Sequence, residues 1–111
     1  MARIYRLDEL RRSTRATFFD RYELNQLLSL YSRRVASGEW RDYAIDQSGG
    51  SALFSIFRHT LDAPAYAIAK RTRGAGKDRE YVVLSGRETL KRATTMSEAL
   101  SVFERRLRVV S

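Results

Sequence analysis

The chain has 111 residues, the length of one domain, and 43% of them are hydrophobic, a globular composition that excludes a disordered chain. It has no cysteine, which excludes disulfides and thiolate metal sites. Its 21 basic residues, all but three of them arginine, outnumber 13 acidic ones and give a net charge of +8. This charge favours polyanionic partners, although codon bias in a GC-rich genome would produce the same arginine excess.

Residues 1–17 are polar and basic and have only weak periodicity, so we expect a flexible basic arm. They contain no apolar run of signal-peptide length, and no segment is apolar enough to span a membrane. Together with the absence of cysteine, this predicts a cytoplasmic protein. Residues 18–111 are predicted to form a single α+β domain.

A helix is predicted over residues 21–36. Asp20 and Glu23 form an acidic variant of a capping box at its start, and apolar residues recur within it at three- and four-residue spacing. Gly38 can adopt the left-handed conformation that ends the helix. Trp40 follows, and because tryptophan is usually largely buried, we expect it to fill the corner between helix and sheet rather than contact a ligand or a base.

Alternating apolar residues and turn clusters predict four or five short strands after this helix. The predicted strands cover residues 41–46, 52–59, 65–71, 81–84 and 89–92. Their connections are short, which favours antiparallel pairing. A second helix begins after Thr95, which forms a capping box with Glu98. The sequence therefore predicts an α+β fold with an N-terminal helix, an antiparallel meander of four to five strands and a C-terminal helix.

Two stretches of sequence are similar to a known family. The first is FDRYELNQLLSLYSRRVASGEWRDYAID, residues 19–46, and the second is the series FSIFRHT, YAIAKR, LKR and VFERRL that follows it. The chain resembles the domain of unknown function 2794 family, small proteins found mainly in alphaproteobacteria. The resemblance implies a cytosolic single-domain protein without an assigned activity, and it carries over no catalytic or binding residues.

The sequence offers few groups for catalysis. His59 is the only histidine and cysteine is absent, which excludes a histidine metal cluster and a cysteine nucleophile. The glycine-bearing stretches 48–51 and 73–77 lack the spacing of a P-loop. Asp42 and Asp46 share a strand face and could hold a hard cation, but a solvated strand face is the more ordinary role. We therefore expect no enzyme activity, no metal and no cofactor.

The basic stretch 70–79 is the candidate nucleic-acid site, with a net charge of +4 on a hairpin that should project from the sheet. Such hairpins can enter a groove or follow a phosphate backbone. The next turn and strand, together with the basic termini, could add phosphate contacts. The hypothesis is a small DNA- or RNA-binding protein with a regulatory or accessory role. The predicted contacts are Lys70, Arg71, Arg73, Lys77, Arg79, Arg87, Lys91 and Arg92.

An alternative follows from the apolar residues that lie on both faces of the predicted strands 52–59 and 81–84. Two helices could cover one face of the sheet and leave the other for a partner. The residues left exposed would be Leu53, Phe57, Val82 and Leu84. This predicts a non-enzymatic protein-interaction or homodimerisation module. Arginines paired with carboxylates beside an apolar patch would favour it, whereas one continuous positive face would favour nucleic-acid binding.

Overall fold

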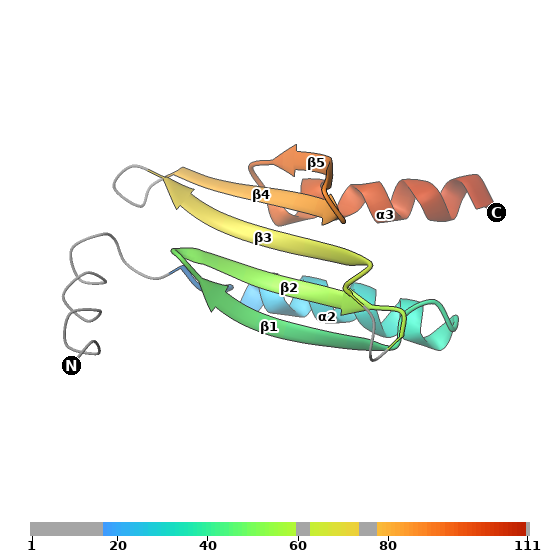
Figure 1. Cartoon of the computed structure of the whole chain (residues 1–111). Helices are drawn as coiled ribbons and strands as arrows, with labels where there is room; N and C mark the ends of the chain where they lie inside the picture. The colour runs from blue at the N-terminus through green and yellow to red at the C-terminus, as the bar shows by residue number, and fades with distance from the viewer. Residues whose placement is uncertain (1–16, 60–62, 74–77, 111) are drawn as a thin grey trace, which may run out of the picture.

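A computed structural model of the chain describes residues 17–59, 63–73 and 78–110, without the side chains of residue 73 and of residues 105–110. Of the predicted basic arm, only Thr17 lies within these residues. The elements are α2 (Arg21–Ala36), β1 (Asp42–Ser48), β2 (Ser51–Phe57), β3 (Tyr66–Arg73), β4 (Asp78–Ser85), β5 (Glu88–Ala93) and α3 (Met96–Val110) (Figure 1). This order confirms the predicted α+β fold, with five strands.

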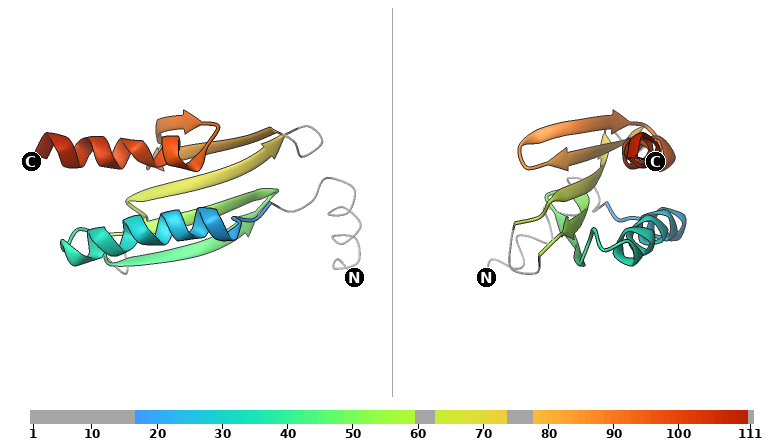
Figure 2. Two further views of the ribbon diagram at one scale, coloured as in Figure 1. Left: turned by 180° about the vertical axis from the view of Figure 1, so that it is seen from behind. Right: turned by 90° about the vertical axis from the view of Figure 1, so that its right-hand side faces the viewer.

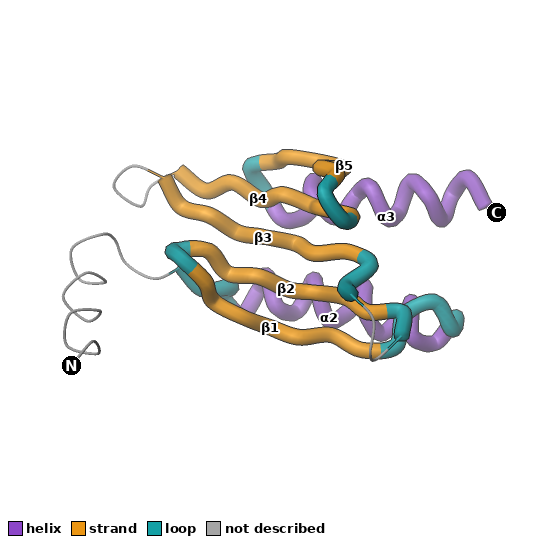
Figure 3. Tube along the Cα trace, in the orientation of Figure 1, coloured by secondary structure: helices purple, strands orange, loops and turns teal. Residues whose placement is uncertain are grey.

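The strands form one antiparallel sheet in the order β1-β2-β3-β4-β5, so that each strand pairs with its neighbour in the chain (Figure 3). Strands β3 and β4 are longer than predicted, because residues 71–73 and 78–80 pair with each other instead of forming a loop. Opposite charges on the two strands favour this pairing, as where Arg71 lies in register with Glu80.

Helix α2 follows the prediction at both ends. At its start the Asp20 carboxylate accepts a hydrogen bond of 2.8 Å from the Glu23 backbone N–H, and Glu23 accepts one of 2.8 Å from the Asp20 backbone N–H. This reciprocal capping box satisfies two of the N–H groups that have no partner within the helix. The helix ends at Ala36, and Gly38 follows with a φ of 82°.

Both helices lie on the same face of the sheet (Figure 2). In Figure 1, α2 runs behind β1 and β2, and α3 runs behind β4 and β5, which it contacts. We call this the helix-covered face, and the opposite one the open face, because no described helix or strand lies over it. None of the described helices is long and apolar enough to cross a membrane.

Alternate residues of the central strands point into a core between the sheet and the helices. The most deeply buried side chains of this core are Phe54, Ile56, Ile68 and Val83 of the sheet, Leu27 of α2 and Phe103 of α3. Ala69 and Val82 are also buried, at 5% and 1% exposure, but they lie outside this cluster. The strand alternation places them on the open face, so the sheet carries apolar residues on both sides.

Trp40 packs at the corner where the chain leaves α2 and enters the sheet. Its side chain is 3% exposed, and its ring centroid lies 5.4 Å from that of Phe103 and 6.1 Å from that of Tyr66. The guanidinium of Arg34 lies 5.2 Å from the indole centroid and donates a 2.9 Å hydrogen bond to the Phe103 carbonyl. Trp40 therefore has the structural role expected from the sequence, joining α2, the sheet and α3.

Candidate functional site on the open face of the sheet

The strand register divides the predicted phosphate contacts between the two faces. Those on the helix-covered face are Lys70, Arg79 and Lys91. Those on the open face are Arg71 and Arg92. Arg87 is exposed in the turn between β4 and β5. Lys77 lies outside the described residues, and Arg73 is described only by its backbone at the end of β3. The described members of the set therefore do not form one continuous positive face.

Lys70 is buried beneath α2, with 5% of its surface exposed. Its ammonium lies 2.7 Å from the Glu23 carboxylate and donates a hydrogen bond of 2.8 Å to the Phe18 carbonyl. The Tyr81 hydroxyl donates a hydrogen bond to the second oxygen of the same carboxylate. A buried charge requires a paired partner of this kind. Lys70 thus links the sheet to α2 and is inaccessible to a phosphate group in this structure.

Tyr81 and Arg79 lie beside this buried pair, in a cavity of about 230 Å³ that both helices reach with their N-terminal ends. The pKa of Tyr81 is raised to about 12, chiefly by burial and also by the hydrogen bond to Glu23 and the negative charge of Glu23, while Arg79 opposes these effects. The phenol is therefore protonated at neutral pH and acts as a hydrogen-bond donor to the carboxylate.

The two described arginines of the open face share one carboxylate. Glu80 lies 4.0 Å from the guanidinium of Arg71 and 3.2 Å from that of Arg92, and the two arginine side chains are 48% and 58% exposed. Glu80 was not among the predicted site residues. The strand register, which pairs it with Arg71, is the signal that could have identified it. The three side chains carry a net charge of only +1.

One row of residues crosses the whole open face. Asp46 of β1, Leu53 of β2, Ala69 of β3, Val82 of β4 and Arg92 of β5 are consecutive partners in the register of the sheet. Residues in register point to the same face. The row is acidic at one end, apolar in its middle and basic at the other end. Its two charged ends are residues that the sequence places 46 positions apart, so only the fold brings them into line.

The neighbouring row gives the centre of the open face its shape. Ser55 of β2, Ala67 of β3 and Leu84 of β4 are consecutive partners. Alanine on the central strand in both rows leaves a low strip along β3 between larger side chains. Leu53 and Leu84 on either side are half-buried, as is Phe57, which is registered with Asp42 at the acidic side. Leu53, Phe57, Val82 and Leu84 therefore lie on the face without helices, but they are not exposed as expected: Leu53, Phe57 and Leu84 are half-buried and Val82 is 1% exposed.

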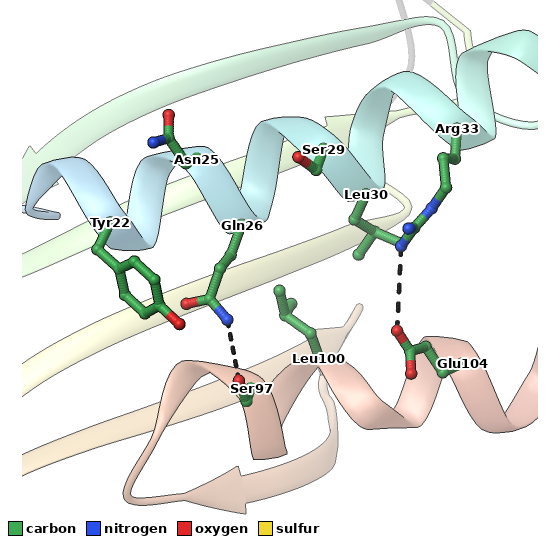
Figure 4. Close-up of a pocket in the computed structure, with 9 residues that line it drawn as sticks. All are labelled: Tyr22, Asn25, Gln26, Ser29, Leu30, Arg33, Ser97, Leu100 and Glu104. Atoms are coloured by element: carbon green, nitrogen blue, oxygen red, sulfur yellow. Dashed lines mark hydrogen bonds and ion pairs between the residues drawn. The ribbon is translucent and has the colours of Figure 1, made fainter.

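A second cavity lies on the helix-covered side of the molecule, between α2 and α3, with a volume of about 410 Å³ (Figure 4). Gln26 donates a hydrogen bond of 2.9 Å to Ser97 across it, and its charged residues Arg33 and Glu104 lie 4.0 Å apart and face each other. Within the described residues, no group of three or more histidine, cysteine or acidic side chains could hold a metal ion. The cleft offers hydrogen-bonding groups without a pattern that indicates a reaction.

The sequence model of a family described as "Protein of unknown function (DUF2794)" matches residues 17–100. The match covers the described domain from the residues before α2 into α3, and the chain belongs to this family. No curated protein and no solved structure matches the chain.

Proposed function

We propose that this member of the DUF2794 family is a non-enzymatic protein-interaction module that acts through the open face of its sheet. The observation that supports this most directly is the placement of both helices on one face, although the strands carry apolar residues on both. An antiparallel sheet with one solvated face normally has polar residues there. An apolar centre rimmed by charged groups is instead typical of a surface that binds another protein.

The ion pairs of the described arginines and lysines also support an interaction role. Lys70 is buried against Glu23, Arg34 is buried and pairs with Glu39, and Arg71 and Arg92 both pair with Glu80. A phosphate could not reach Lys70 or Arg34 without breaking a buried pair. Among the described side chains, these cations are therefore held in ion pairs rather than gathered on one binding surface.

Thiol labelling can test the interaction role because the chain has no cysteine of its own. Leu53→Cys introduces a thiol at a half-buried position of the open face, and Ser29→Cys introduces one at an exposed position of α2 as the matched control. Each variant is labelled with a membrane-permeable maleimide, once in the cells that express it and once as dilute purified protein. We expect Leu53→Cys to react several-fold more slowly in cells, while Ser29→Cys reacts at similar rates in both.

Equal labelling of Leu53→Cys in cells and in dilute solution would contradict the proposal, because a surface that is occupied by a partner must be protected there. The thermal unfolding of both variants serves as the check that each is folded. The comparison of rates within one variant removes differences in the intrinsic reactivity of the two thiols.

Nucleic-acid binding is the second candidate, supported by the overall charge and by two exposed arginines, Arg87 in the turn between β4 and β5 and Arg92 in β5. Fluorescence anisotropy with labelled duplex DNA, single-stranded DNA and RNA at several salt concentrations tests it. If binding occurs through phosphates, the logarithm of the binding constant should fall linearly with the logarithm of the salt concentration. Arg87→Gln should then reduce that slope, and an absence of binding at low salt would rule this candidate out.

A further inference from the structure

We propose that a second copy of this chain covers the open face, in a symmetric dimer whose two-fold axis runs parallel to the strands and passes over β3. This inference rests on the proposed function and names the partner of the same surface. The observation that supports it is the row of residues from Asp46 to Arg92, which is acidic at one end and basic at the other.

Symmetry allows two simple ways to place one open face on another. In a two-fold dimer, if residue i contacts residue j of the partner, then j also contacts i of the partner. An axis parallel to the strands places β1 of one copy over β5 of the other. An axis across the strands places β1 over β1 and β5 over β5.

The charges distinguish these two arrangements. With the axis parallel to the strands, Asp46 of each copy faces Arg92 of the other, so the dimer contains two opposite-charge contacts. Each contact neutralises the net charge of +1 that Arg71, Glu80 and Arg92 carry together. With the axis across the strands, the acidic strands face each other, and Asp42 and Asp46 on one copy oppose the same carboxylates on the other. Electrostatic complementarity selects partners and fixes their orientation, and it favours the first arrangement.

The apolar middle of the row is also complementary to itself about this axis. Leu53 of one copy lies over Val82 of the other, and Ala69 lies over Ala69 where the axis passes. Because Val82 and Ala69 are 1% and 5% exposed in the monomer, the half-buried Leu53 supplies most of the new apolar contact. The small residues of β3 allow two sheets to approach to the usual spacing of about 10 Å, with the strand directions about 30° apart. Larger side chains on either side of β3 then fill the space between the sheets.

Pairing through the edge of β1 is the competing way to dimerise, and Tyr43 and Ile45 at that edge are 39% and 48% exposed. In the antiparallel register centred on Ile45, which gives the longest overlap, Asp42 and Asp46 of both copies would bring four carboxylates into one edge-to-edge pair. Charged residues on an edge strand are a common device against edge pairing. The carboxylates of β1 therefore oppose edge pairing and suit a basic partner above the open face.

The size of the face indicates a reversible dimer. Five strands of about seven residues present a face of about 24 Å by about 23 Å, so two faces together bury roughly 1,100 Å², near the lower limit for specific interfaces. We expect a monomer–dimer equilibrium that depends on concentration.

Analytical ultracentrifugation of the full chain tests the proposal, over a range from about 1 μM to about 500 μM that includes the affinities expected of small interfaces. The unmodified chain should dimerise with rising concentration. Asp46→Arg alone and Arg92→Asp alone each create two like-charge contacts per dimer and should weaken dimerisation by at least about tenfold. Circular dichroism establishes that both variants are folded.

Two further samples make the test specific for the orientation. A chain that carries both Asp46→Arg and Arg92→Asp restores both opposite-charge contacts and should dimerise again. An equimolar mixture of the two single variants should form the mixed dimer, in which every contact is again complementary. Glu104→Arg, an exposed charge reversal on the other side of the molecule, is the control and should leave dimerisation unchanged.

Two results would overturn the proposal. If Asp46→Arg dimerises as the unmodified chain does, the orientation is wrong. If the chain stays monomeric throughout the range, a second copy is not the partner. In that case, protection of Leu53→Cys in cells would still support a different protein partner, and protection in dilute purified protein would indicate that another segment of the same chain covers the face. The dimer can thus fail while the interaction role stands.

Discussion

The two faces of the sheet are built from the same strands, yet their charged side chains differ in burial and in pairing. On the helix-covered face, Lys70 and Glu23 are 5% and 4% exposed and form a pair that also binds Tyr81. On the open face, Arg71 and Arg92 are about half exposed and share the Glu80 carboxylate at the rim of an apolar centre. A buried charge must be fully paired, whereas a rim charge remains available to a partner. Under the proposed function, the helix-covered face is complete within the monomer and the open face is completed by a partner.

The largest contrast is expected between two phenylalanines of β2. Phe54 is fully buried on the helix-covered face, and Phe57 is half-buried on the open face. Phe54→Ala should reduce the free energy of unfolding by about 4 kcal/mol, because it leaves a cavity in the core. Phe57→Ala should cost about 1 kcal/mol in dilute monomer, where little apolar contact is lost. Urea denaturation measures both, and equal losses would contradict the distinction between the faces.

Lys70→Met tests the pairing on the helix-covered face. It leaves the Glu23 carboxylate buried without its cation and should reduce the free energy of unfolding by about 3 kcal/mol. Adding Glu23→Gln removes the unpaired charge while keeping a side chain that can complete the capping box, so the double variant should recover part of the loss. If the double variant is less stable than Lys70→Met, the loss of stability in Lys70→Met is not caused by an unpaired Glu23 carboxylate.

The pKa of Tyr81 predicts a dependence of stability on alkaline pH. A pKa raised from 10.0 to about 12 in the folded chain means that folding favours the protonated phenol. The resulting stabilisation is fully present below about pH 10 and is lost as pH rises from there towards about 12. Tyr81→Phe should therefore show a shallower fall in stability over this window than the unmodified chain. In a titration followed by tyrosinate absorbance, Tyr81→Phe should show one tyrosine fewer ionising near pH 12 than the unmodified chain. Identical titrations of the two proteins would contradict the raised pKa of Tyr81.

The smallest effect is expected at the rim of the open face. Glu80→Gln leaves Arg71 and Arg92 without their shared carboxylate, but both guanidinium groups are about half exposed to water. Exposed ion pairs contribute little, so the free energy of unfolding should change by about 0.5 kcal/mol. A loss as large as that of Lys70→Met, measured by the same urea denaturation, would show that this rim is part of the monomer's stability.

The elements of the fold could be predicted because local chemistry specifies them. The Asp20–Glu23 capping box and Gly38 define α2 without tertiary information, and apolar alternation identifies the strands. The connection predicted between the strands at 65–71 and 81–84 was too long because pairing between β3 and β4 continues into polar sequence. Its composition resembles a loop, whereas the cross-strand pairing that extends the strands depends on both segments together.

The placement of single charges was harder to predict. Lys70 continues the alternating series of Tyr66 and Ile68, a signal that would have placed it on the buried face, but its charge suggested a surface contact. Asp46 and Arg92 share a row only through four consecutive strand pairings, and the irregular register between β4 and β5 near Val83 cannot be derived from spacing. The candidate site on the open face therefore required the structure.

The most direct test of the account is an isotope-filtered NOE experiment on a mixture of labelled and unlabelled chain, at a concentration where the protein self-associates. The account predicts intermolecular contacts between the methyl groups of Leu53 in one copy and Val82 in the other, together with contacts across Ala69. Intermolecular contacts confined to Tyr43 and Ile45 at the edge of β1 would contradict it, because they would show that the second copy binds the strand edge and leaves the open face uncovered.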